Sequence, residues 1–332
     1  MKTISSRFSA KLLSNVIFGI VSVITAAILP RTLGSGSYGN LHFIRESVTR
    51  IFGLIDLNGS LAHFVYSSKN KESKKATFFH TYYSFIVGFL VLLLFSIMFL
   101  TNSANVFFPG QKMEYIFLGA ILGYLIYLGT NLTNLSDSKE ITVGFEIRRV
   151  VVLVGGLLFL LLLYFLDLIN LRSVFGYYIF INVILVIISV KYLNRKRVYN
   201  FHFNRLEKTE IKEFVKYYYN YTHPLVAASV LTFIILYFDR WFLQLIGGSN
   251  EQGFFSLAFR VSSICILVTG AMSPIFQQGV AKAFGQNSLS TIQALFQKIN
   301  LFYFISASIA VFFSLMLKKS SIYLVEVNTV KH

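Results

Sequence analysis

Charged side chains lie inside residues 38–66, a segment that is long and apolar enough to cross a membrane. They are His42, Arg45, Glu46, Arg50 and Asp56. Each charge at the middle of a bilayer costs about 2.5–3.5 kcal/mol on insertion scales. The first four recur at the i, i+3, i+4, i+8 spacing of one helical face. We therefore expect this face to turn away from lipid, toward a protein interior or a wet cavity, as in a transporter of polar or charged solutes.

Arginine suits the binding of an anionic solute in such a cavity, because its planar guanidinium offers forked donors to phosphate oxygens. The candidates for solute binding are Arg31, Arg45, Arg50, Arg240 and Arg260. Two of them have a structural alternative. Glu46 and Arg50, four residues apart, can form an ion pair in a buried network. Asp239 and Arg240 can form a pair near the membrane surface.

Three carboxylates in apolar surroundings are candidates for ion coupling or for simple charge pairing. They are Glu46, Asp56 and Asp239. The chain has no G-x-x-x-x-G-K-[ST] sequence, which argues against direct nucleotide hydrolysis. The lone Cys265 lies in an apolar run and has no metal-ligand spacing, so we interpret it as a core residue. No catalytic residue, cofactor or metal site is expected.

The composition indicates an all-α, polytopic integral membrane protein. Apolar residues make up 55% of the chain, charged residues 13%, and the mean hydropathy is +0.65. The formal net charge of +16 does not indicate nucleic acid binding, because Lys and Arg fall mainly in short connections. About nine spans reach the length that a bilayer requires. They lie near 10–30, 40–65, 78–101, 114–135, 149–167, 174–193, 219–246, 253–275 and 299–318.

The basic residues also predict an orientation with the N-terminus in the cytoplasm, since Lys and Arg are retained on that side. Arg7 and Lys11 precede the first span, Arg148 and Arg149 anchor the fifth, and 244–252 has no basic residue. The predicted regions are a six-helix bundle over 1–193, a basic cytoplasmic connection over 194–216, a partial second bundle over 217–318 and a polar tail over 319–332.

A weak internal repeat links the two predicted bundles. Gly34, Ser35 and Gly39 match Gly248, Ser249 and Gly253 at a constant offset, with an apolar run on either side of each copy. Tight loops often contain Gly and Ser, so the match also has a local explanation. Its spacing of about six spans fits a transporter built from two parallel repeats.

These segments resemble a known family. KLLSNVIFGIVSVITAAILPRTLGSGSYG at 11–39 and YFDRWFLQLIGGSNEQGFFSLAFRVSSI at 237–264 are similar to polysaccharide flippases of the Wzx type. That family belongs to the multidrug/oligosaccharidyl-lipid/polysaccharide superfamily, alongside MATE exporters. The resemblance extends over residues 8 to about 316. Its most specific part is the R-x-L-G-x-x-x-Y-G stretch beginning at Arg31.

The resemblance implies a bacterial inner-membrane protein of about twelve or more helices in two bundles. Such a protein is not an enzyme. It moves undecaprenyl-diphosphate-linked oligosaccharides to the outer face for O-antigen, lipopolysaccharide, capsule or exopolysaccharide assembly. The implied partners are the lipid-linked oligosaccharide, membrane lipids, a polysaccharide polymerase and a chain-length regulator. Lys318, Lys319 and a polar tail follow the ninth predicted span, where the family continues with further helices. We therefore expect a truncated chain with poor or no flippase activity.

Other functions predict different sequence features. A MATE-like exporter of small cations should carry acidic residues in its lumen, whereas arginines outnumber acids in the predicted spans. A membrane glycosyltransferase should show acidic clusters at the membrane edge, and an O-antigen polymerase should carry a large outward loop. A membrane scaffold without transport activity remains a further alternative.

Overall fold

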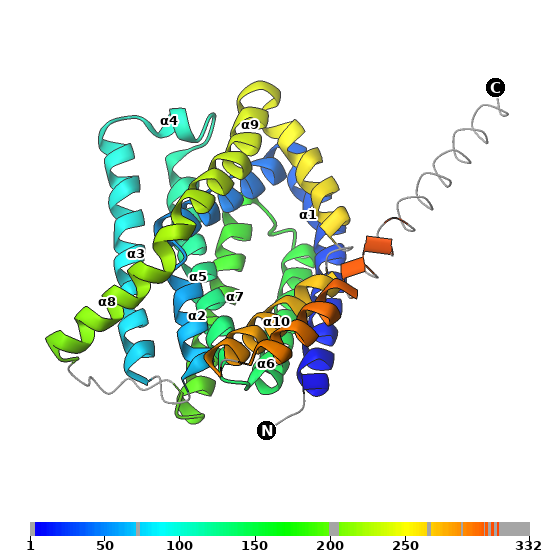
Figure 1. The fold of residues 1–332 in the computed structure, drawn as a ribbon. Coiled ribbons are helices and arrows are strands. Elements are labelled where there is room, and N and C mark those ends of the chain that lie inside the picture. Colours follow the sequence, from blue (N-terminus) through cyan, green and yellow to red (C-terminus); the bar gives the residue numbers. More distant parts are fainter. Residues whose placement is uncertain are drawn as a thin grey trace.

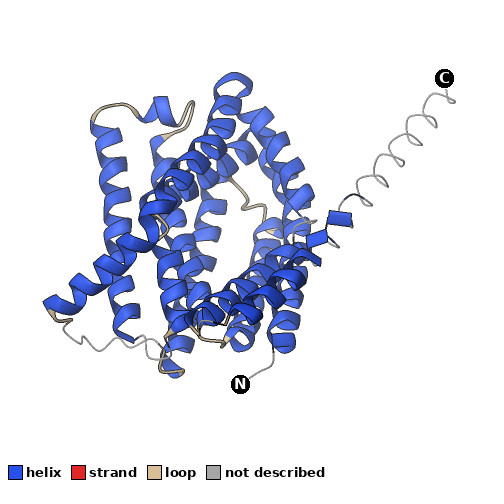
Figure 2. Cartoon of the chain, in the orientation of Figure 1, coloured by secondary structure: helices blue, strands red, loops and turns tan. Residues whose placement is uncertain are grey.

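The chain is described by a computed structural model that covers residues 4–70, 74–198, 206–263, 267–286 and 288–301, together with 303–304, 307–308 and 311. Within these residues the regular elements are helices, joined by short loops (Figure 2). The structure thus confirms the all-α class. The helices in chain order are α1 (Ile4–Asp56), α2 (Gly59–Lys69), α3 (Lys74–Leu100), α4 (Ala104–Phe107), α5 (Met113–Ser138), α6 (Thr142–Phe165), α7 (Leu171–Arg195), α8 (Lys208–Thr222), a 3-10 turn (His223–Leu225), α9 (Val226–Ser262) and α10 (Leu267–Gly285).

Six helical stretches in the described part of the chain are long and apolar enough to cross a membrane. They are α1, α3, α5, α6, α7 and the continuous stretch from α8 into α9. Large apolar side chains cover outer surfaces of these helices; on α3, Phe85 and Phe89 are more than half exposed. In water such a surface would be unfavourable, whereas lipid tails can cover it. The fold supports a multi-pass membrane protein.

The two longest helices each reverse direction at a glycine. A straight helix of 53 residues, the length of α1, would extend about 80 Å, far beyond the ~30 Å of a hydrocarbon core. Gly34 interrupts it with φ 74° and ψ 162°, and Gly248 interrupts α9 with φ 69° and ψ −169°. Glycine adopts positive φ at little cost because it lacks a Cβ. Both reversals lie at the end opposite the N-terminus (Figure 1).

At this end the segments that follow the two turns cross in close contact. A Cβ atom on Gly39 would lie 1.9 Å from the carbonyl oxygen of Ser249, and one on Gly253 would lie 2.2 Å from that of Ser35. Each glycine therefore packs on the backbone of the other copy. Ser35 Oγ also donates to Asn250 Oδ1 at 2.7 Å. The residues that match in the sequence thus make reciprocal contacts in the structure.

The hydrophobic core surrounds the second arm of α1, residues 35–56. Leu41, Phe43, Ile44 and Val48 are fully buried there, packed among α5, α7 and α9. This arm carries most of the charged residues that the sequence placed inside a span. Protein rather than lipid surrounds it, which is the environment that the cost of burying charge predicts.

Some predicted spans differ from the observed helices. The span predicted over 40–65 is not one helix, since α1 ends at Asp56, Leu57 and Asn58 have positive φ, and α2 begins at Gly59. Part of the predicted basic connection, from Lys208 onward, is α8.

Other predictions fall partly or wholly outside the described residues. The span over 253–275 is divided between α9 and α10, and residues 264–266, including Cys265, lie outside the described part. Most of 299–318 and all of 319–332 also lie outside it.

Candidate functional site

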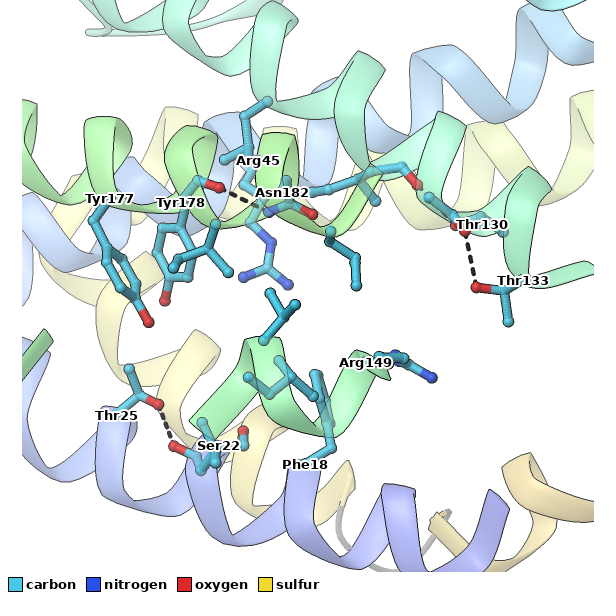
Figure 3. A pocket seen from close by; sticks show the side chains of 18 of the residues that line it. Phe18, Ser22, Thr25, Arg45, Thr130, Thr133, Arg149, Tyr177, Tyr178 and Asn182 are labelled. Carbon is cyan, nitrogen blue, oxygen red and sulfur yellow. Dashed lines mark hydrogen bonds between the residues drawn. The ribbon is translucent and has the colours of Figure 1, made fainter. Parts of the chain in front are cut away.

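A cavity of about 260 Å³ lies inside the first half of the molecule, between α1, α5, α6 and α7. Its charged lining residues are Arg45 on α1, Arg149 on α6 and Arg260 near the end of α9. No Asp or Glu is among the described residues that line it. The Asn182 amide and the hydroxyl groups of serine, threonine and tyrosine complete the polar part of the wall (Figure 3). The cavity is therefore cationic and rich in hydrogen-bonding groups.

Arg260 reaches this cavity because α9 turns back at Gly248. Its Nε donates to Ser22 Oγ on α1 at 2.7 Å. Its Nη1 is buried and has no hydrogen-bond partner among the described residues. The hydroxyls of Tyr38 and Tyr178 lie near this guanidinium, but neither has a well-aligned hydrogen bond with it. A buried charged donor without an acceptor is costly, so this group is available to an anionic ligand.

The other two arginines, Arg45 on α1 and Arg149 on α6, line other parts of the cavity wall. Arg45 extends toward the middle of the cavity, with its guanidinium carbon 5.7 Å from the centre of the Tyr178 ring (Figure 3). Arg149 lies at the edge of the cavity, 5.7 Å from the Phe18 ring, and its Nη1 contacts Glu146 Oε2 at 3.4 Å. That contact is long for a charge-assisted hydrogen bond, which leaves the guanidinium able to turn toward a ligand.

The size of the cavity limits what it can enclose. At ~30 Å³ per water molecule it has room for about nine waters. This volume suits a phosphate or diphosphate group with part of its hydration shell. A whole lipid-linked oligosaccharide is larger, so the cavity fits a charged head rather than an entire substrate of that kind.

Arg50 does not share this cavity with Arg45. It lines a separate groove of about 350 Å³ between α1, α2 and α9. Residues five apart are about 140° apart around a helix of 3.6 residues per turn, and the second arm of α1 has protein on several sides. The two arginines therefore face different neighbours. Arg50 Nη2 also lies 3.9 Å from Glu46 Oε2, the ion pair that the sequence offered as an alternative.

The remaining candidate arginines lie elsewhere. Arg31 is exposed on α1. Arg240 is buried, donates to Ser256 Oγ at 2.8 Å and lies 4.5 Å from the Phe255 ring. Its neighbour Asp239 is exposed, so the two occupy opposite environments on α9. Of the five candidates, Arg45 and Arg260 are the two that line the cavity of about 260 Å³ in the described part of the chain.

Asp56 has a structural role at the start of α2. Its carboxylate accepts hydrogen bonds from the Ser60 backbone N–H at 3.1 Å, from Ser60 Oγ at 2.9 Å and from Tyr127 Oη at 2.7 Å. A carboxylate in this position satisfies free N–H groups of the first helical turn. Asp56 thereby explains why the predicted span 40–65 breaks into two helices.

Sequence reasoning missed a group of buried and partly buried polar residues at the N-terminal end, which we call the ionic cluster. It consists of Arg7, Lys11, Asp137, Glu140, Glu146, Gln278 and Lys282. Lys11 pairs with the fully buried Asp137 and lies 3.9 Å from Glu146 Oε1. Ser14 Oγ donates to Glu146 Oε2 at 2.7 Å. The sequence did contain a signal for this cluster. Asp137, Glu140 and Glu146 fall within ten residues between two apolar runs, and Arg7 and Lys11 are four residues apart at the start of the first predicted span.

The ionic cluster joins α10 to the first half of the molecule. Arg7 Nη2 donates to the Asp137 carbonyl at 3.0 Å, and its Nη1 donates to Gln278 Oε1 at 2.8 Å. Gln278 Nε2 donates in turn to Glu140 Oε1 at 3.2 Å, and Lys282 also pairs with Glu140. The sequence treated Arg7 and Lys11 as basic residues preceding a span. In the structure both are buried within α1.

Two groups in the connection between α5 and α6 have shifted pKa values. Burial, together with the charge of Lys282, lowers the pKa of Lys139 to about 8. Burial by itself would raise the pKa of Glu140, but hydrogen bonds from Lys282 and Gln278 and the charges of Lys282 and Arg7 hold it below its usual value. Glu140 is therefore ionised at neutral pH and pairs with cations from both halves of the chain.

Comparison with protein-family models, with curated proteins and with solved structures found no match to this chain. The functional interpretation therefore rests on the residues and the geometry described above.

Proposed function

We propose that this protein is a multi-pass membrane flippase that moves a lipid-linked, diphosphate-bearing oligosaccharide across a bacterial inner membrane. The observation that carries the proposal is the cavity in which the unpartnered Arg260 Nη1 lies with Arg45 and Arg149 and without a lining carboxylate. Phosphate oxygens would satisfy these donors, since arginine binds them through forked, charge-assisted hydrogen bonds. A cation exporter would need acidic groups in the same place.

The arrangement of the chain also supports transport. The matched turns at Gly34 and Gly248 lie at equivalent places in the two predicted bundles, and Arg260 of the second bundle lines the cavity together with residues of the first. Transporters built from two parallel repeats bind substrate between them. In this proposal about nine spans cross the membrane, six of them in the first bundle.

The distribution of basic residues gives the orientation in this proposal. The end of α2, the start of α3 and the ends of α5 and α7 lie on the side of the molecule that holds the N-terminus (Figure 1). Lys69, Lys74, Lys139 and Arg195 stand at these helix ends. Positive residues are retained in the cytoplasm, so this end faces inward and the turns at Gly34 and Gly248 face outward. The substrate then enters from the cytoplasmic leaflet and leaves at the outer face.

A binding experiment tests the proposal. Purified protein in nanodiscs is titrated with undecaprenyl diphosphate, with undecaprenol and with a cationic dye, and Trp241 fluorescence or native mass spectrometry reports binding. The diphosphate should bind more tightly than the other two. Arg260→Gln and Arg45→Gln should each weaken it about 10- to 100-fold, since a hydrogen bond to a charged group contributes about 1.5–3 kcal/mol.

The exposed Arg31 supplies a matched control, and Arg31→Gln should leave the affinity unchanged. Equal affinity for the diphosphate and for the uncharged alcohol would contradict the proposal. Tighter binding of the cationic dye would favour an exporter instead. A cellular test uses a strain that lacks its own flippase and produces surface polysaccharide only with this protein. There, Arg260→Gln should reduce surface polysaccharide without lowering the amount of protein in the membrane.

A further inference from the structure

A second cavity, of about 190 Å³, lies on the opposite side of α5 from the arginine-lined cavity, among α2, α3, α5 and α7. Its apolar wall consists of Phe85, Leu128, Leu132, Leu135, Val186 and Val190. The polar part of its lining comes from His63, Thr77, His80, Thr81, Ser84 and Asn131. Phe85 at its margin is 62% exposed on the outer face of α3, so the cavity borders the region that lipid would occupy.

Two buried polar atoms in this cavity lack partners among the described residues. They are His80 Nε2 and Asn131 Oδ1, on side chains that are 5% and 8% exposed. Most buried polar groups in proteins are hydrogen-bonded, so an unsatisfied pair that lines one cavity points to a ligand. The neighbouring His63 does not supply the missing contact, since its Nε2 contacts Ser67 Oγ at 3.2 Å and its ring stacks on His80.

The surrounding hydrogen bonds define the chemistry of the two atoms. Ser84 Oγ donates to the His80 carbonyl at 2.9 Å, so its oxygen can only accept from Asn131 Nδ2, at 3.3 Å. Asn131 Oδ1 therefore remains as an acceptor. On the other side, the buried Tyr218 hydroxyl lies 3.3 Å from His80 Nδ1. We assign the hydroxyl as the donor in this contact, and this tautomer of His80 carries its proton on Nε2. The cavity thus presents one free donor and one free acceptor.

A single hydroxyl group satisfies both atoms, because it accepts from His80 Nε2–H and donates to Asn131 Oδ1. An anion would be repelled by the amide oxygen, and an ester carbonyl would leave that oxygen unsatisfied. The leucine and valine wall calls for an apolar body attached to the hydroxyl. His80 also lies about 9 Å along α3 from its first residue, near the depth of a lipid's polar end.

We infer that this cavity binds a membrane lipid with a neutral hydroxyl head, of the long-chain alcohol or diacylglycerol class. The inference is independent of the proposed transport function, because none of these residues lines the arginine-lined cavity.

Photolabelling tests this inference in full-length protein held in phosphatidylcholine nanodiscs. The probes are a diazirine-bearing hexadecanol and its methyl ether, which can accept a hydrogen bond but cannot donate one to Asn131. The alcohol should label peptides 77–85 and 128–135 saturably, and at least ~fivefold more strongly than the ether, as loss of one hydrogen bond implies. In the Asn131→Leu variant, labelling by the alcohol should fall to the level of labelling by the ether.

Ser96→Leu, on the exposed face of α3, is the control for an added leucine and should keep the difference between the two probes. Equal labelling by alcohol and ether in the wild-type protein would overturn the inference, whether or not Asn131→Leu folds. Absence of saturable labelling would also overturn it and would show that the cavity holds water only.

Discussion

The two halves of the chain meet at opposite ends of the molecule through two different kinds of contact. At the end that holds the turns at Gly34 and Gly248, backbone packs directly on backbone, with Gly39 against Ser249 and Gly253 against Ser35. At the end that holds the N-terminus, α10 meets the first half through the ionic cluster, in which Glu140 joins cations from both halves. The first contact depends on close packing of backbone at two glycines, whereas the second depends on charged and polar side chains.

This difference determines which substitutions each contact can accept without loss of the folded structure. A glycine crossing depends on volume alone, because a methyl group on either glycine would enter the space of a carbonyl oxygen. A buried ion pair depends on charge, because removing one partner leaves the other desolvated and unpaired. The crossing should therefore respond to size and not to pH, and the ionic cluster should respond to charge and pH.

The largest expected effect comes from adding volume at the crossing. Gly39→Leu should abolish the folded state, since the new Cβ would lie 1.9 Å from the Ser249 oxygen. The measurement is the monodisperse fraction after size-exclusion chromatography of protein solubilised in detergent. Gly53→Ala is the control on the same arm of α1, where a Cβ would have no neighbour within 4 Å. A folded Gly39→Leu protein would refute the backbone contact.

Removing one charge of an ion pair inside the ionic cluster should have the next largest effect. Asp137→Asn removes the nearer of the two carboxylates beside the buried Lys11 and leaves only Glu146 Oε1, at 3.9 Å, so it should destabilise the protein by about 3 kcal/mol. Thermal unfolding in nanodiscs measures the change. Replacing both partners, as Lys11→Met with Asp137→Leu, should recover much of the loss, because neither charge of the pair remains and Glu146 keeps Arg149 Nη1 at 3.4 Å. Equal damage in the single and double variants would mean that the pair itself is not the cause.

The contact between Glu140 and Lys282 should depend on pH. The folded-state pKa of Glu140 lies below its usual value of 4.5, so its contribution to stability is present above pH 4.5. That contribution is lost as pH falls through the lower, folded-state value. Hydroxyl-radical footprinting of α10 should show increased exposure in this acid range. In Glu140→Gln the exposure should be raised already at neutral pH and should change little with acid.

The smallest effect is expected at an exposed ion pair that also joins the two halves. Lys75 on α3 pairs with Glu210 on α8, and the Lys75 side chain is 57% exposed. Water and salt screen such a pair, so it contributes little to stability. Lys75→Ala should leave the unfolding temperature unchanged within error at physiological salt. A clear destabilisation would show that α8 depends on this contact more than its exposure suggests.

Much of the fold was predictable from the sequence because membrane spans have a strong local signal. The helices α3, α5, α6 and α7 lie where apolar runs of bilayer length predicted them. The matched Gly34 and Gly248 both mark turns, since glycine adopts positive φ at little steric cost. Charge inside the second arm of α1 correctly indicated that protein surrounds it, because lipid would penalise those residues.

What the sequence could not decide was which neighbour each polar residue faces. The sequence placed Arg45 and Arg50 at the two edges of one broad helical face, about 140° apart, and the structure separates them: one lines the arginine-lined cavity and the other lines a groove beside α9. Arg149 and Arg7 resembled membrane anchors, but helix packing turns the first toward the cavity and the second into the ionic cluster. Sequence fixes spacing along one helix, whereas only packing between helices brings distant residues into one site.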